Sequence, residues 1–173
     1  FYFNNFRWIG NTKYSSEYLN KVLNIKKGEI YNEKLLNERL VASPNSTDVS
    51  SLYLDDGYLS FSAQPVEVAV NNDSIDFEIR IYEGKQFRVN RVSVVGNTKT
   101  NDHIIRRELR TNPGDLFSRS DLQRSMRELI NLGYFDQEQM DVHPAPNPQD
   151  GTVDIEYVVG EKPSDQIELS GGW

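Results

Sequence analysis

The sequence of 173 residues predicts an α+β fold made of two tandem β-α-α-β-β modules, each a small three-stranded mixed sheet with two helices on one face. Three observations predict it. Residues 86 positions apart repeat, as at Gly10 and Gly96. Each copy ends in a run that alternates apolar and polar residues, typical of a half-buried strand, and helically spaced apolar residues precede that run. Tandem copies of one small unit favour a scaffold that positions partners over a single catalytic pocket.

The repeat is carried by glycines, a short polar turn and buried leucines. The matched pairs are Gly10 and Gly96, Asn11 and Asn97, Thr12 and Thr98, Lys13 and Lys99, Leu23 and Leu109, Gly28 and Gly114, and Leu36 and Leu122. Further along, Asp76-Phe77-Glu78 corresponds to Asp154-Ile155-Glu156. These pairs place the modules at residues 1–85 and 86–163.

In the first module, a strand runs into the turn at Gly10, and a helix begins at Ser15 or Ser16, residue types that cap helices. A second helix begins at Asn32 and is lengthened by about ten residues around Ala42 to Ser51. A strand from Tyr58, a turn and a closing strand follow. The closing strand alternates strictly, with these residues facing inward: Ile75, Phe77, Ile79 and Ile81.

The second module repeats this order. A strand over residues 87–95 stops at Gly96, Thr100 or Asn101 caps one helix, and Ser118 caps another. That second helix carries a buried stripe at Leu122, Met126, Leu129 and Ile130. A strand from Tyr134 to about Val142 and a closing strand over residues 152–159 complete the module.

Proline marks the fourth element of both modules, at Pro65 and at Pro144. Because proline has no N–H to donate to a β-ladder, it is confined to edge strands or strand ends. The fourth element is therefore predicted to be a sheet edge in each module. An edge strand is a template for another extended chain, although the same prolines also read as protection against such pairing.

Composition and charge exclude several kinds of protein. The net charge of −7 combines −3 for residues 1–86 (9 basic, 12 acidic) with −4 for residues 87–173 (10 basic, 14 acidic), which argues against a nucleic-acid partner. Without cysteine there is no disulfide, thiol nucleophile or thiolate metal site. No apolar run is long enough for a membrane-spanning helix. The chain opens mid-strand at Phe1, so we expect it to be a fragment.

No motif predicts catalysis, a metal site or a cofactor. His103 and His143 lack neighbouring ligands at metal-binding spacing, and the adjacent Asp55 and Asp56 diverge on a helix. The two Gly-Asn-Thr-Lys segments have one glycine each and place threonine before lysine, unlike a phosphate loop. We read them as turns and expect a protein that is not an enzyme.

The second module resembles a POTRA (polypeptide-transport-associated) domain. The residues that carry the resemblance are Val92-Ser93-Val94-Val95-Gly96-Asn97, Ile105-Arg106-Arg107-Glu108-Leu109, Gly114-Asp115-Leu116-Phe117, Leu132-Gly133-Tyr134-Phe135 and the strand at 153–161. The first module matches more loosely, through Gly10-Asn11-Thr12, Gly28-Glu29, Leu54-Asp55-Asp56-Gly57-Tyr58 and residues 76–84. Residues 166–173 resemble the passage from the last POTRA domain into the barrel of outer-membrane protein assembly factors. The modules would then be the fourth and fifth, with 164–173 a linker into the first barrel strand.

The resemblance implies a periplasmic scaffold that receives unfolded outer-membrane proteins, docks accessory assembly lipoproteins and passes clients to a C-terminal barrel in the outer membrane. Clients would add to the edge strands by backbone pairing. From element order we place these edges at Phe61, Ser62, Ala63, Gln139, Met140, Asp141 and Val142. The alternative is the POTRA region of a two-partner secretion or other barrel-type exporter with one dedicated client. The junction is short, and Gly84 is the expected hinge between the modules.

Overall fold

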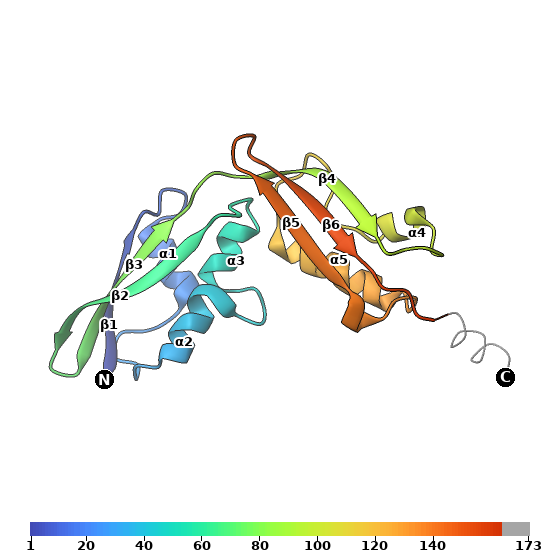
Figure 1. The fold of residues 1–173 in the computed structure, drawn as a ribbon. Coiled ribbons are helices and arrows are strands. Elements are labelled where there is room, and N and C mark those ends of the chain that lie inside the picture. Colours follow the sequence, from blue (N-terminus) through green and yellow to red (C-terminus); the bar gives the residue numbers. More distant parts are fainter. Residues whose placement is uncertain (164–173) are drawn as a thin grey trace. The chain divides into compact units, whose positions relative to one another are not determined.

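The chain folds into two compact units, Phe1–Gln86 and a second that begins at Phe87, in a computed structural model that describes residues 1–163. Each unit contains one three-stranded mixed sheet with helices packed on it (Figure 1). The predicted α+β fold of two β-α-α-β-β modules is confirmed. The predicted linker at 164–173 lies outside the described residues.

The first unit builds its sheet in the order β1-β3-β2, with β1 parallel and β2 antiparallel to the central strand β3. Its elements are β1 (Tyr2–Ile9), α1 (Ser16–Leu23), α2 (Glu33–Asn37), the π-helical turn η1 (Glu38–Ala42), α3 (Val49–Leu54), β2 (Ser62–Asn71) and β3 (Ser74–Tyr82).

The second unit has the same topology, with sheet order β4-β6-β5. Its elements are β4 (Arg88–Val95), α4 (Asp102–Arg106), α5 (Arg119–Asn131), the 3-10 turn η2 (Gln137–Gln139), β5 (Asp141–Asn147) and β6 (Thr152–Val158).

The central strands supply the core, as their alternation predicts. Ile75, Phe77, Ile79 and Ile81 are buried on β3, and Val153, Ile155 and Tyr157 on β6. Predicted helix caps are also confirmed: the side chains of Ser15, Asn32 and Ser118 each accept a hydrogen bond from the first turn of the helix that follows. Asn101, rather than Thr100, caps α4.

The prediction of one lengthened helix after Asn32 was wrong. The segment forms α2, η1 and α3, separated by a loop at residues 43–48. Ser43 is extended (φ −69°, ψ 131°) because it precedes Pro44, whose ring disfavours helical backbone in the preceding residue. Asp48 then caps α3 by accepting hydrogen bonds from the amide of Ser51, at 3.2 Å, and from its hydroxyl. The insertion therefore starts a new helix.

The prediction of a continuous strand from Tyr134 to Val142 was also wrong. Residues 134–136 do pair with residues 160–162, but η2 interrupts the extended chain before β5 begins at Asp141. The interruption has a local cause, since the Asp136 carboxylate accepts a hydrogen bond from the amide of Glu138 and stabilises the turn.

Candidate functional site

The hairpin strands β2 and β5 are the open edges of the two sheets. The described residues place no further strand beside either one, so the predicted edge position of the fourth element is confirmed. β2 is ten residues long and leaves Val68 and Val70 about half exposed. An edge of this length presents a row of backbone groups that another extended chain can pair with.

The opposite edges are covered where they begin. In the first unit the amide of Phe3 donates to the carbonyl of Glu29, and the amide of Gly28 donates to the carbonyl of Phe3. In the second unit the amide of Val89 donates to Asp115, and the amide of Gly114 donates to Val89. The repeated segments 28–31 and 114–117 therefore act as edge covers, a role that their recurrence alone did not reveal.

The seven predicted edge residues fall into different positions. Ser62 and Ala63 lie in β2 and Phe61 just before it, while Asp141 and Val142 begin β5. Gln139 ends η2 and Met140 follows it, so neither belongs to the strand. Gln139 instead packs over Gly160, where a Cβ atom would overlap its side chain. Placing these last two residues on the edge strand was wrong.

The two open edges differ in the backbone donors that they can offer. In β5, Pro144 and Pro146 are two residues apart, so their backbone nitrogens face the same side of the strand. Since a proline nitrogen cannot donate to the ladder with β6, that side is the open edge. Because each lacks an N–H, that edge loses two donors over seven residues, whereas β2 loses only one, at Pro65. The first unit therefore carries the better template for strand addition.

The Gly-Asn-Thr-Lys turns do bind an anion, but that anion belongs to the chain itself. The Glu83 carboxylate accepts hydrogen bonds from the hydroxyl and amide of Thr12, the amide of Lys13 and the hydroxyl of Tyr53. Glu161 occupies the same place in the second unit, accepting from Thr98, Lys99 and Thr100. Each carboxylate ties the end of the central strand to the first turn.

These contacts explain the direction of two pKa changes. Desolvation raises the pKa of the Glu83 carboxyl, but the hydrogen bonds from Thr12, Lys13 and Tyr53 outweigh it, so the pKa lies below its ordinary value. The same balance lowers the pKa of Glu161. Burial, followed by the hydrogen bond to Glu83, raises the pKa of the Tyr53 hydroxyl and keeps it protonated as a donor. Both turns are structural latches.

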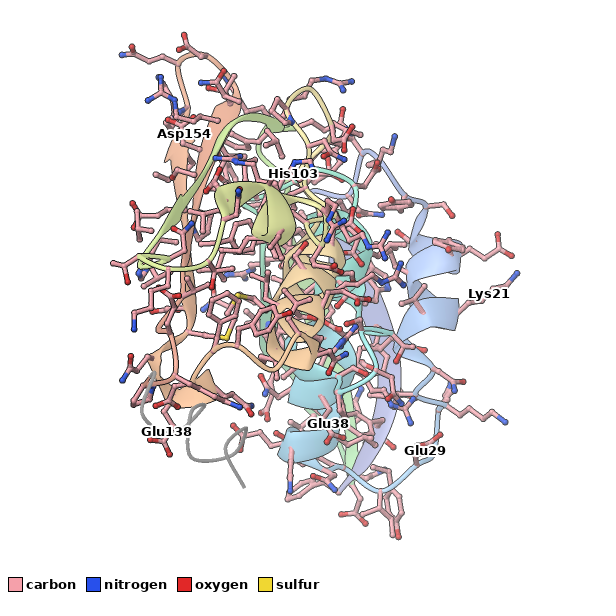
Figure 2. All side chains as sticks on the ribbon, turned by 90° about the vertical axis from the view of Figure 1, so that its right-hand side faces the viewer. Lys21, Glu29, Glu38, His103, Glu138 and Asp154 are labelled. Atoms are coloured by element: carbon pink, nitrogen blue, oxygen red, sulfur yellow. The ribbon has the colours of Figure 1, made fainter. Side chains whose placement is uncertain are left out.

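The candidate chemical residues do not form a site. His103 is exposed on α4 (Figure 2), and His143 is exposed on β5 with its Nε2 3.5 Å from Asp141. Asp56 accepts a hydrogen bond from the Tyr14 hydroxyl at 3.1 Å and lies 3.6 Å from Lys13. Across residues 1–163, no cluster of three His, Asp or Glu residues is arranged to hold a metal ion. Within that range no helix has the length and apolarity needed to cross a membrane.

Gly84, the predicted hinge, follows β3 and has a φ of +69°. A Cβ atom there would lie 3.2 Å from the ring of Tyr82 and 3.4 Å from Ser60. Positive φ and close neighbours both favour glycine at this position. Its role as a hinge stays a prediction.

Comparison with known proteins decides the family. The POTRA family model, described as "Surface antigen variable number repeat", matches residues 1–84 and again residues 87–162. The chain belongs to the POTRA family. It holds two tandem POTRA domains, and the repeat found in the sequence is the repeat of that domain.

Curated relatives are outer-membrane protein assembly factors. The chain is 32% identical over 155 residues to BamA of Neisseria meningitidis serogroup B, a match that covers 90% of this chain and 19% of that protein. It is 28% identical over 156 residues to BamA of Neorickettsia risticii, covering 90% and 20%. The chain is thus homologous to the POTRA region of BamA and spans about a fifth of the length of these relatives. They are named as assembly factors, a family that is not enzymatic.

Solved structures share the fold. POTRA domains 3–5 of Haemophilus influenzae BamA superpose with a TM-score of 0.77 at 20% identity, covering 93% of this chain and 61% of that one. BamA of Haemophilus ducreyi lacking POTRA domains 1–3 gives a TM-score of 0.76 at 22% identity, covering 94% and 30%.

Proposed function

We propose that this chain is the periplasmic POTRA region of an outer-membrane protein assembly factor and that it receives unfolded β-barrel clients by strand addition. The observation that carries the proposal is the uncovered ten-residue edge of β2 in a module homologous to the POTRA region of BamA. Backbone pairing suits clients of many sequences, because main-chain groups supply the affinity. Accessory lipoproteins and a C-terminal barrel that accepts the client complete the proposed machinery.

Two features support β2 over the other strand edges as the client site. The opposite edge, β1, already has backbone partners at its start. β5 is shorter and lacks two donors at Pro144 and Pro146. The assembly-factor function is favoured over a dedicated exporter because the curated relatives carry that name.

Site-specific photocrosslinking tests strand addition. A photoreactive residue replaces Gln64 on β2. As a matched control it replaces Ile30 in the edge cover, because the side chain of Ile30 is 72% exposed and is more hydrophobic than that of Gln64. A urea-denatured outer-membrane β-barrel protein is diluted into the labelled chain, and crosslinks are quantified. We expect strong crosslinking at position 64 and weak crosslinking at position 30. Equal yields at the two positions would indicate nonspecific hydrophobic adsorption and overturn the proposal.

A further inference from the structure

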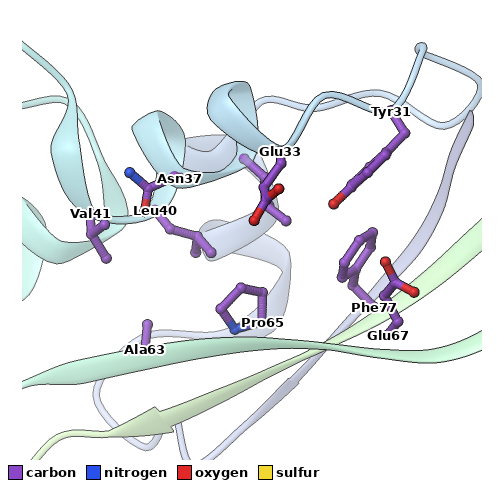
Figure 3. A pocket seen from close by; sticks show the side chains of 10 residues that line it. Tyr31, Glu33, Asn37, Leu40, Val41, Ala63, Pro65, Glu67 and Phe77 are labelled. Carbon is purple, nitrogen blue, oxygen red and sulfur yellow. The ribbon is translucent and has the colours of Figure 1, made fainter.

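A pocket lies beside the open edge strand of the first unit, between β2 and the helical segment formed by α2 and η1 (Figure 3). Its cavity volume is about 270 Å³, slightly below the roughly 300 Å³ at which sites for drug-sized ligands begin. This is space for one large side chain rather than for a cofactor. The strand contributes Ala63, Pro65 and Glu67 to the lining.

The floor of the pocket is apolar and aromatic. Leu36, Leu40 and Phe77 line it and are buried in the core of the unit. The ring of Tyr31 stacks on Phe77, with centroids 5.8 Å apart and an interplanar angle of 22°. These side chains offer a surface for the aliphatic stem of a long side chain and a ring face for a cation.

Two carboxylates stand at the rim. Glu33 comes from the first turn of α2 and Glu67 from β2, and both side chains are exposed. Neither forms an ion pair or a side-chain hydrogen bond with any residue in the described part of the chain, and the lining contains no lysine, arginine or histidine. The Glu33 carboxylate and the Tyr31 hydroxyl are turned toward each other (Figure 3). Desolvation raises the pKa of the Tyr31 hydroxyl, and the charges of Glu33 and Glu67 raise it further, so the negative potential of both carboxylates reaches the same hydroxyl.

The pocket is in line with the next position in the sheet. Ala63, Pro65 and Glu67 are alternate residues of β2, so their side chains share the face that looks toward α2. A strand added beside β2 turns its own alternate side chains to the same face. One of them would therefore enter the space between Pro65, Glu67 and α2.

We propose that this pocket selects an extended segment that carries a lysine or arginine side chain at the position opposite Pro65. The inference rests on strand addition at β2, as proposed above. An added strand shields Glu33 and Glu67 from water, and an apolar side chain would leave both carboxylates desolvated and unpaired. A basic side chain instead packs its stem on the floor and donates charge-assisted hydrogen bonds to the rim.

Peptide binding tests this selectivity. The probes are blocked nine-residue peptides of alternating threonine and valine that differ only at the central residue: arginine, glutamine, phenylalanine or glutamate. Binding to the full chain is measured by the movement of β2 amide resonances. We expect the arginine peptide to bind about tenfold more tightly than the glutamine peptide, the ratio that one charge-assisted hydrogen bond produces, and to lose that advantage at high salt.

A double variant assigns the preference to the pocket. Glu33→Gln with Glu67→Gln should abolish the arginine preference, whereas Glu17→Gln, an exposed change on α1, should preserve it. Circular dichroism establishes that the variants fold. Equal binding of all four peptides, or a preference for phenylalanine, overturns the selectivity but leaves strand addition intact. If no peptide binds, strand addition and this inference are overturned together. If the preference for arginine survives the double variant, it arises at another site and the inference is overturned.

Discussion

Replacing Gly10 by alanine should destabilise the first unit far more than replacing Gly28, although the two glycines have nearly the same backbone conformation. Their φ angles are +90° and +93°. A Cβ atom at Gly10 would overlap the carbonyl oxygen of Ile81 at the end of β3, whereas a Cβ atom at Gly28 meets nothing within 4 Å. Gly28→Ala therefore measures the conformational cost alone, and Gly10→Ala adds the steric overlap.

The expected magnitudes differ accordingly. An L-residue in left-handed backbone costs about 1–2 kcal/mol, and alanine recovers about 0.4–1 kcal/mol by restricting the unfolded chain. Gly28→Ala should thus lower the free energy of unfolding by about 1 kcal/mol. The overlap with Ile81 cannot relax through a side chain, because both groups are backbone, and it adds about 1–3 kcal/mol, the usual cost of overpacking.

Urea unfolding followed by the fluorescence of Trp8, which is buried in the first unit, measures both variants. The sequence contains two tryptophans, Trp8 and Trp173, so a Trp173→Phe background leaves one reporter. With a urea m-value of about 1–3 kcal/mol/M, the Gly10 variant should unfold about 1 M below the Gly28 variant. Equal midpoints would refute the steric argument. Gly96→Ala against Gly114→Ala repeats the comparison in the second unit, where a Cβ at Gly96 would overlap the carbonyl of Val159; because Trp8 lies in the first unit, the amide resonances of β6 follow unfolding there.

Three further changes test the latches, the caps and the strand irregularity. The pKa of Glu83 is lowered in the folded state, so the stabilisation from its carboxylate is present above the unfolded pKa of about 4.3 and disappears as pH falls through the folded pKa. Glu83→Gln should therefore flatten the pH dependence, below pH 5, of the urea midpoint that Trp8 fluorescence reports. Parallel pH profiles of the variant and the parent would count against the latch. Ser118→Ala removes the acceptor for the Asp121 amide at the start of α5 and should cost about 1 kcal/mol in denaturant unfolding, whereas Ser118→Asn should cost little. Asp76→Ala removes the acceptor for the side chain of Asn4, at 2.7 Å, and for the amide of Asn5, at 3.0 Å, where β1 shifts register. It should lower the free energy of unfolding by about 1–2 kcal/mol. Asp73→Ala in the adjacent turn is the control, and an equal loss of stability in both variants would contradict the role assigned to Asp76.

Strand alternation and helix caps were predictable from the sequence because their causes are local. The buried face of β3 follows from every second residue being apolar, and Ser15, Asn32 and Ser118 cap helices through bonds within one turn. The interruption at η2 was missed because the aromatic pair Tyr134-Phe135 favours a strand. The Asp136 side chain, which stabilises the turn, was the available signal.

What the sequence could not reveal depends on distant segments meeting. The recurrence of Gly28 and Gly114 was plain, but their pairing with β1 and β4 exists only in the folded chain. Likewise Glu33 and Glu67 are far apart in sequence, and only the return of β2 beside α2 brings them to one pocket. Neither carboxylate belongs to a recognisable motif, because the chemistry of the pocket lies in its placement.

The edge covers at residues 28–31 and 114–117 affect whether tandem copies of such a module can associate through their sheet edges. A sheet with two free borders could fuse with its neighbours into a continuous ribbon, the usual route to aggregation in β-proteins. Blocking one border where it begins gives each module a polarity, with a closed side and a receptive side. Duplicating the module then adds one open edge per copy, and a module with a single open edge cannot serve as a link in a continuous ribbon. If clients add to these edges as proposed, a long client bound by one copy meets the next copy at a high effective concentration, and the proposed capacity to retain unfolded chains then grows with the number of modules.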